Sequence, residues 1–287
     1  MAKDCGSFMQ RALFRCKGLL VVLICLYSAT AWSQRPTLRI GYVEFPPYEF
    51  QDAQGNAAGS FIELTRRVAA EAGYRTEFIY LPPSRLYLYL REGRIDVWPG
   101  LTYIPTLQDH VLVSESIPLR IELSAWHLKG TPPVRQFDDL RNRPLILVSG
   151  YTYGGLASYL NQQSGTRLSY SATHESAVDM LRLARGDYLI DYREPIEALG
   201  RTEPMADLRQ SFLLETVATW LFSLKDEHAR QFQADFDAAY QRLQARDELP
   251  FEPEPAMNAR LPGFPDLPVR DTADVRAVGS GVKGLGE

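Results

Sequence analysis

Apolar positions in the first hundred residues follow two spacings, one typical of strands and one typical of amphipathic helices. Three short apolar runs predict strands at residues 38–43, 76–81 and 94–98. Two segments with helical spacing lie between them, at residues 60–73 and 84–91, and Gly93 follows the second as a stop signal. This β-α-β-α-β order predicts a largely parallel sheet that is covered by helices on both faces.

A second α/β series follows the first. Its predicted helices are residues 137–142, 156–163 and 175–185, and its predicted strands are residues 144–149, a segment near Leu168, and 188–192. Extended segments at 121–128 and 217–224 flank this series, so we expect the chain to cross into a second unit and then return. The closing helix, 226–249, should pack on the first unit. Residues 250–287 are Pro-rich and then Gly-rich, which predicts a disordered tail.

Residues 1–33 have the pattern of a secretory signal peptide. Four basic residues precede an apolar run at 18–27, and small residues then allow cleavage after Ala31 or Ser33. The alternative is a membrane anchor, but ten apolar residues fall short of the ~20 that cross a bilayer. We therefore expect export to the periplasm.

Removal of this leader changes the charge and the cysteine content. All three cysteines lie within it, so the exported chain has none and must rely on its core for stability. The remaining chain has 27 basic and 34 acidic residues, a net charge of −7. That balance argues against binding to nucleic acid or to an anionic membrane, both of which favour basic patches.

The stretch LRIGYVEFPPYEF, residues 38–50, joins a predicted strand to an aromatic turn. Ligands of open α/β units bind at the carboxyl ends of strands, and the two prolines fix the turn there. Glu44 and Tyr48 are therefore expected to face a cleft, where an aromatic ring offers a flat wall or a cation–π face. Phe45 and Phe50 are expected to be packing residues.

Residues 38–249 resemble family 3 of the bacterial extracytoplasmic solute-binding proteins, the amino-acid-type receptors of ABC transporters. The resemblance rests on LRIGYVEFPPYEF, DAQGNAAGSFIEL, REGRIDVWPGLT, FDDLRNRPLILVSGYTYG and the closing amphipathic helix. It implies the type II periplasmic-binding-protein fold, in which two α/β lobes are joined by two hinge strands and close on a ligand in the cleft. The first lobe would comprise residues 36–122 and 222–249, and the second residues 123–221.

The resemblance also implies ligand contacts in the first lobe. The segment VWPGLTY would line the cleft through Trp98, Gly100 and Thr102. The family usually places an arginine that clamps the ligand carboxylate a few residues later, but Leu107 occupies that position and cannot form such a pair. Arg85, at the start of a helix, is the available substitute; a solvated surface role is equally open.

In the second lobe, the turn SGYTYGG makes Tyr151, Thr152 and Tyr153 candidates for holding a carboxylate. The strand end GDYLIDYREP offers Asp191 and Glu194 as partners of a ligand ammonium. Asp191 has apolar neighbours, so it is either a ligand contact or half of a structural ion pair.

The sequence contains no metal-binding, P-loop or serine-hydrolase signature, and we expect no cofactor. The predicted function is capture of a small polar solute, an amino acid or a related amine or carboxylate, for ABC import or sensing. The expected partner is an ABC permease or the periplasmic domain of a sensor protein, and the chain is expected to be a monomer. The alternative is an enzyme similar to cyclohexadienyl dehydratase, which would need a catalytic cleft carboxylate.

Overall fold

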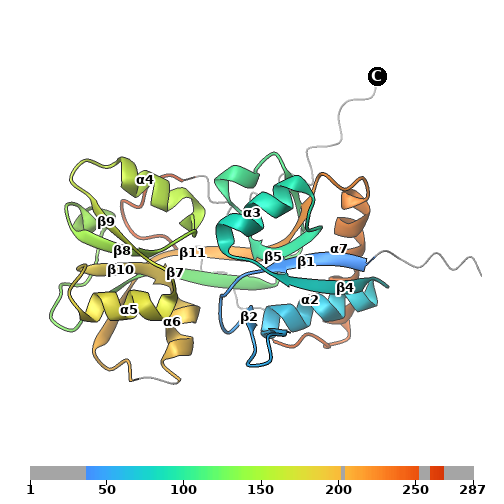
Figure 1. Cartoon of the computed structure of the whole chain (residues 1–287), viewed down its shortest axis with the longest axis horizontal. Helices are drawn as coiled ribbons and strands as arrows, with labels where there is room; N and C mark the ends of the chain where they lie inside the picture. Colours follow the sequence, from blue (N-terminus) through green and yellow to red (C-terminus); the bar gives the residue numbers. More distant parts are fainter. Residues whose placement is uncertain (1–36, 202–203, 252–258, 268–287) are drawn as a thin grey trace, which may run out of the picture. The chain divides into compact units, whose positions relative to one another are not determined.

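The computed structural model describes residues 37–201, 204–251 and 259–267 of the chain. The predicted leader at 1–33 and most of the predicted disordered tail lie outside these residues. The described part contains two β-sheets, one of nine strands and a two-stranded ribbon (Figure 1). The ribbon consists of β2 (Phe50–Gln51) and β3 (Ala57–Ala58), directly after the aromatic turn.

The large sheet contains strands from both α/β series. Its first part has the order β4-β1-β5, and its second part has the order β10-β8-β9. The bounds in the first part are Thr37–Tyr42 for β1, Arg75–Tyr80 for β4 and Val97–Leu101 for β5. Those in the second part are Pro144–Val148 for β8, Arg167–Ser171 for β9 and Tyr188–Tyr192 for β10. Within each part these strands pair in parallel, as the sequence pattern predicted.

Two long strands connect the two parts of the sheet. They are β7 (Leu119–Leu128) and β11 (Leu208–Ser223), which pair with each other antiparallel. β7 also pairs with β10, whereas β11 pairs with β5 and with the short strand β6 (Val111–Val113). The chain therefore crosses between the two α/β units twice, and the predicted two-lobed α/β fold is confirmed.

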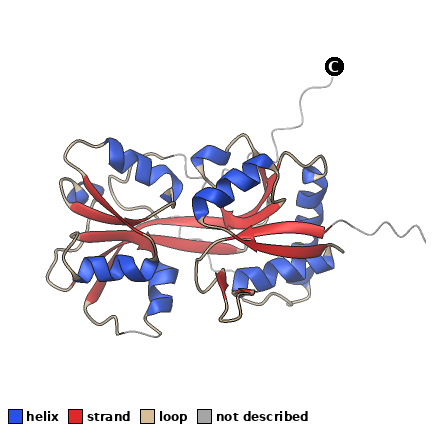
Figure 2. Ribbon diagram, in the orientation of Figure 1, coloured by secondary structure: helices blue, strands red, loops and turns tan. Residues whose placement is uncertain are grey.

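Helices lie on both sides of the strands (Figure 2). They are α2 (Ser60–Glu71), α3 (Pro83–Glu92), α4 (Leu156–Gln162), α5 (His174–Arg182), α6 (Arg193–Leu199) and α7 (Ala229–Ala245), with 3₁₀ turns η1 (Pro105–Leu107), η2 (Phe137–Leu140) and η3 (Tyr153–Gly155). α3 begins with proline and ends at Gly93, whose φ of 71° suits glycine. The closing helix α7 packs against α2 and β11 of the first lobe, as predicted.

The expectation of a disordered tail from residue 250 is wrong for residues 259–267. The Leu261 amide donates to the Leu213 carbonyl at 2.8 Å, and the Phe137 amide donates to the Pro262 carbonyl at 2.9 Å. Leu213 lies where the register of β7 and β11 shifts, so its carbonyl can accept from outside the ladder. Leu261 and Phe264 are buried there, and Phe264 packs edge-on against Phe137. Two apolar side chains and an irregular strand thus order a segment whose composition predicts disorder.

Candidate functional site

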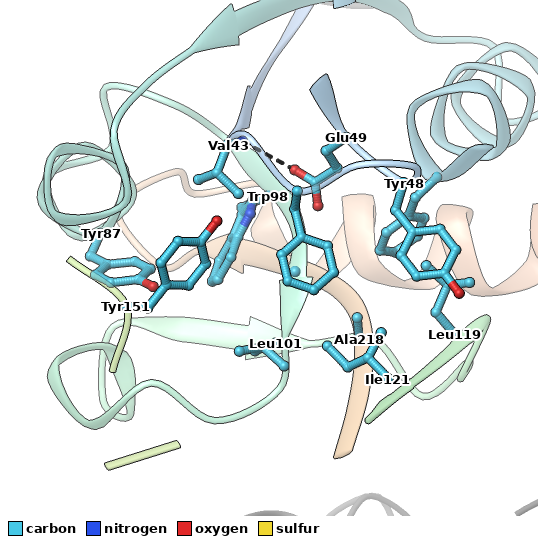
Figure 3. A pocket seen from close by; sticks show the side chains of 13 residues that line it. Val43, Tyr48, Glu49, Tyr87, Trp98, Leu101, Leu119, Ile121, Tyr151 and Ala218 are labelled. Atoms are coloured by element: carbon cyan, nitrogen blue, oxygen red, sulfur yellow. Dashed lines mark hydrogen bonds between the residues drawn. The ribbon is translucent and has the colours of Figure 1, made fainter. Parts of the chain in front are cut away.

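The turn after β1 builds the floor of the site. The Phe45 carbonyl accepts from the Tyr48 and Glu49 amides, both at 3.0 Å, and the Pro46–Pro47 peptide bond is cis. This tight turn brings Glu49 back beneath the end of β1, where it is 4% exposed. Its Oε2 accepts from the Val43 amide at 3.2 Å (Figure 3). Glu49 was not among the candidate residues predicted from the sequence.

A mostly apolar pocket opens above this turn, with an empty volume of about 410 Å³ that includes space open to solvent. Side chains of the first lobe, of both hinge strands and of the second lobe contribute to it. Its lining residues are Val43, Phe45, Tyr48, Glu49, Phe61, Tyr87, Trp98, Gly100, Leu101, Leu119, Ile121, Tyr151 and Ala218. Several aromatic rings therefore enclose the space, and Glu49 provides its carboxyl group (Figure 3).

Four of the candidate residues from the sequence line this pocket: Tyr48, Trp98, Gly100 and Tyr151. Gly100 allows the Trp98 ring to lie close, because a β-carbon at residue 100 would come within 2.0 Å of that ring. The Trp98 indole Nε1 is buried and has no hydrogen-bond acceptor among the described residues. Phe45, expected to be a packing residue, is buried as predicted and also forms part of the wall.

Three other candidates lie near the pocket but do not line it. Thr102 is buried, and its hydroxyl has no partner within the described part of the chain. The Thr152 hydroxyl, at the start of the turn before α4, is also buried and has no hydrogen-bond partner among the described residues. Tyr153 is buried beneath this turn, where its hydroxyl accepts from the Val148 amide at 2.8 Å and fixes the turn to β8.

Asp191 was expected to be either a ligand contact or half of a structural ion pair, and the structure shows it paired with His174. Its side chain is 0% exposed, its Oδ2 lies 2.6 Å from His174 Nδ1, and its Oδ1 accepts from the Tyr192 amide at 2.8 Å. Burial lowers the pKa of His174, but the Asp191 carboxylate outweighs it and leaves the pKa above its usual value. Asp191 is therefore half of a buried pair with His174.

The backbone of Glu44 joins the two lobes, whereas its side chain is exposed. The Tyr151 hydroxyl donates to the Glu44 carbonyl at 2.7 Å, and His174 Nε2 lies 3.3 Å from the same oxygen. A carbonyl oxygen has two lone pairs and can accept both bonds. Residue 44 thus contributes through its main chain, which sequence reasoning about its carboxylate did not predict.

Glu194 lies outside the pocket lining. It is buried with Glu122 of β7, whose amide donates to Glu194 Oε1 at 3.2 Å, and Arg193 lies 3.6 Å from both carboxylates. Burial raises the pKa of Glu194 to about 7, because the hydrogen bonds and Arg193 only partly offset the loss of hydration. Its other oxygen, Oε2, has no partner among the described residues.

None of the described residues that line the pocket is basic. Arg85 is exposed and does not line it, and Leu107 is 0% exposed in the core of the first lobe. The described pocket lining therefore has no guanidinium group that could pair with a ligand carboxylate. The titratable groups in the described lining are one carboxylic acid, Glu49, and the phenols of Tyr48, Tyr87 and Tyr151.

These features agree with a match to a protein-family model. The model described as bacterial extracellular solute-binding proteins, family 3, matches residues 38–250. The chain belongs to this family. No curated protein sequence matches the chain.

Solved structures share the fold of this solute-binding protein. A histidine kinase sensor domain with similarity to periplasmic binding proteins is 22% identical, with a TM-score of 0.66 over 77% of this chain and 99% of that one. An ancestral arginine-binding protein bound to arginine is 20% identical, with a TM-score of 0.64 over 75% and 96%. A substrate-binding protein of an amino acid ABC transporter from Streptococcus pneumoniae, bound to L-arginine, is 16% identical, with a TM-score of 0.61 over 76% and 92%. The family and these neighbours are mainly binding proteins rather than enzymes.

Two further features of the described residues bear on the site. They contain no group of three or more His, Cys, Asp or Glu side chains arranged to hold a metal ion. None of their helices is long and apolar enough to cross a membrane.

Proposed function

We propose that the protein captures a small polar solute, of amino-acid or amine size, in the pocket between the lobes and releases it unchanged. The observation that carries this proposal is that Tyr151 of the second lobe closes a pocket whose other walls come from the first lobe and the hinge strands. Its hydroxyl bonds to the Glu44 carbonyl and thus joins the lobes where a solute would be enclosed. Residues 36–122 with 222–249 would form the first moving body, and residues 123–221 the second.

Lobe closure would require bending at the two connecting strands. The register shift between Phe212 and Leu214 interrupts the ladder of β7 and β11 and offers one place for it. Export by the predicted leader would put a monomer in the periplasm. The structural neighbours include both a transporter component and a sensor domain, so both an ABC permease and a sensor protein are candidate partners.

Native mass spectrometry tests the proposal directly. The purified protein is incubated with a low-molecular-mass metabolite extract, separated from free solutes, and weighed with and without denaturation. We expect a small adduct that is recovered chemically unchanged and that is lost in Trp98→Ala, which removes a pocket wall. Tyr170→Phe is the control, because Tyr170 is 53% exposed on β9. Absence of any adduct, or an adduct that persists in Trp98→Ala, would contradict capture at this pocket.

A further inference from the structure

We propose that the solute is an organic cation that carries no carboxylate, bound with its cationic nitrogen against Glu49. This inference names the ligand class of the pocket and rests on the proposed function. Several of the amino-acid receptors among the structural neighbours are bound to arginine or glutamine, each of which carries an α-carboxylate. The pocket of this chain differs from what such a ligand needs.

The first argument is charge. A carboxylate that leaves water needs a cation or several hydrogen-bond donors to replace its hydration. No arginine, lysine or histidine is among the described residues that line the pocket, and Glu49 in its ionised form would repel a ligand carboxylate. Arg85 is exposed to solvent and outside the lining. An anionic group would therefore be bound poorly here.

The second argument is the acceptor that Glu49 offers. Its Oε2 accepts the single bond from the Val43 amide, and Oε1 accepts none from the described residues. No basic side chain neutralises it, in contrast to Asp191, which has His174. A ligand N–H that carries positive charge would supply both the missing donor and the missing charge.

The wall of the pocket is largely aromatic. Phe45, Tyr48, Tyr87, Trp98 and Tyr151 present aromatic rings to one space. The faces of such rings attract cations, most strongly where water is excluded. The unpaired Trp98 Nε1 would in addition satisfy an acceptor atom on the ligand, such as a hydroxyl or amide oxygen.

Protonation agrees with this assignment. Burial without a cation raises the pKa of Glu49 well above its usual range, and a cation bound beside it would lower that pKa again. The titratable groups facing it from α3 and from the turn before η3 are the phenols of Tyr87 and Tyr151, whose pKa values burial also raises. These phenols stay neutral near pH 7, so the charge of the occupied site would come from Glu49 and the ligand.

Matched ligand pairs test the inference. Agmatine and arginine differ only by the carboxylate, as do tyramine and tyrosine, and putrescine and ornithine. We would titrate each into the purified protein by calorimetry and follow the melting temperature. We expect at least one amine to bind about tenfold or more tightly than its amino acid, and Glu49→Gln to remove this preference. Glu77→Gln, the same substitution at an exposed site on β4, should retain it.

The outcomes separate the two proposals. If every amino acid binds at least as tightly as its amine, the inference is overturned while solute capture stands. If neither member of any pair binds, the inference is also overturned, and the adduct found by native mass spectrometry decides the proposed function independently. An adduct that contains a carboxylate would reject the organic-cation assignment alone.

Discussion

Glu49 in the first lobe and Asp191 in the second are both buried carboxyl groups near the end of a strand, but they differ in their partners. Asp191 faces His174 at 2.6 Å and also accepts from the Tyr192 amide. Glu49 accepts from the Val43 amide and faces a pocket. The position of an acid along a strand therefore does not define its role. The groups that surround it decide whether it stabilises the fold or is available to a ligand.

The same difference extends to the lobes as a whole. In the first lobe, Glu49 and the Trp98 indole have hydrogen-bonding capacity that the described residues leave unused. In the second lobe, Tyr151 and His174 direct polar groups at the Glu44 carbonyl. We infer that the first lobe recognises the solute and the second lobe fastens the closed state.

The largest expected effect tests the structural side of this comparison. Asp191→Asn removes the charge that faces the buried His174, so we expect the free energy of unfolding to fall by about 3 kcal/mol. Urea denaturation near pH 7 measures it. Glu49→Gln is the matched comparison and should change stability by less than about 1 kcal/mol, because no charged side chain among the described residues pairs with this carboxyl and the amide oxygen of glutamine can still accept from the Val43 amide. Equal losses in the two variants would show that both carboxyls are structural.

The next effect concerns Glu194, a buried acid of the second lobe that lies outside the pocket. Its pKa of about 7 exceeds the usual 4.5, so between these values the folded state retains a proton that the unfolded state releases. Its contribution to stability is therefore fully present below pH 4.5 and is lost as the pH rises through 7, amounting to roughly 3 kcal/mol. Denaturation of Glu194→Gln at pH 5 and pH 8 should show a smaller difference in the free energy of unfolding than the parent protein. An unchanged difference would mean that Glu194 is ionised in the folded state.

Much of the fold was predictable from the sequence, because the longer strands and most helices carry their own apolar spacing, whereas the short strands β2, β3 and β6 were not predicted. The two crossing segments, for example, were predicted at 121–128 and 217–224; the first lies within β7, and the second covers only the last part of the longer β11. The ordered segment 259–267 was not predictable, since its order depends on the irregularity of β11 near Leu213. Composition alone does not show that a distant strand has a free carbonyl.

The site was less predictable for a related reason. Tyr48 was predicted from its place after a strand end and Trp98 from the family resemblance, and the structure places both in the pocket lining. Glu49 was missed because its neighbours Tyr48 and Phe50 were the more obvious candidates. Strand periodicity gives no signal here, because the tight turn closed by the Phe45 carbonyl directs both Tyr48 and Glu49 to the same pocket. Asp191 was recognisable as buried, but its partner His174 lies 17 residues away and is identified only by the fold.

A third prediction sharpens the ligand side of the comparison. For a bound amine, Glu49→Gln should weaken affinity about tenfold to a hundredfold, since it replaces a charge-assisted hydrogen bond by a neutral one. The pKa of Glu49 is raised, so the acid must lose a proton to pair with the amine. Affinity of the parent protein should therefore rise with pH until that carboxyl is ionised. Calorimetry in buffers of different ionisation enthalpy would detect the released proton, and Glu49→Gln should release none. Proton release that persists in the variant would assign the titration to another group.

The smallest predicted effect tests the fastening role of the second lobe. Tyr151→Phe keeps the aromatic wall of the pocket and removes the hydroxyl that donates to the Glu44 carbonyl at 2.7 Å. Because His174 remains close to the same oxygen, we expect a loss of about 1 kcal/mol, seen as a severalfold faster ligand release by stopped-flow fluorescence. The exposed Tyr170→Phe should leave the release rate unchanged. A loss of affinity larger than that of Glu49→Gln would reverse the assignment, because the second lobe would then contribute more to holding the solute than the carboxyl group of the first.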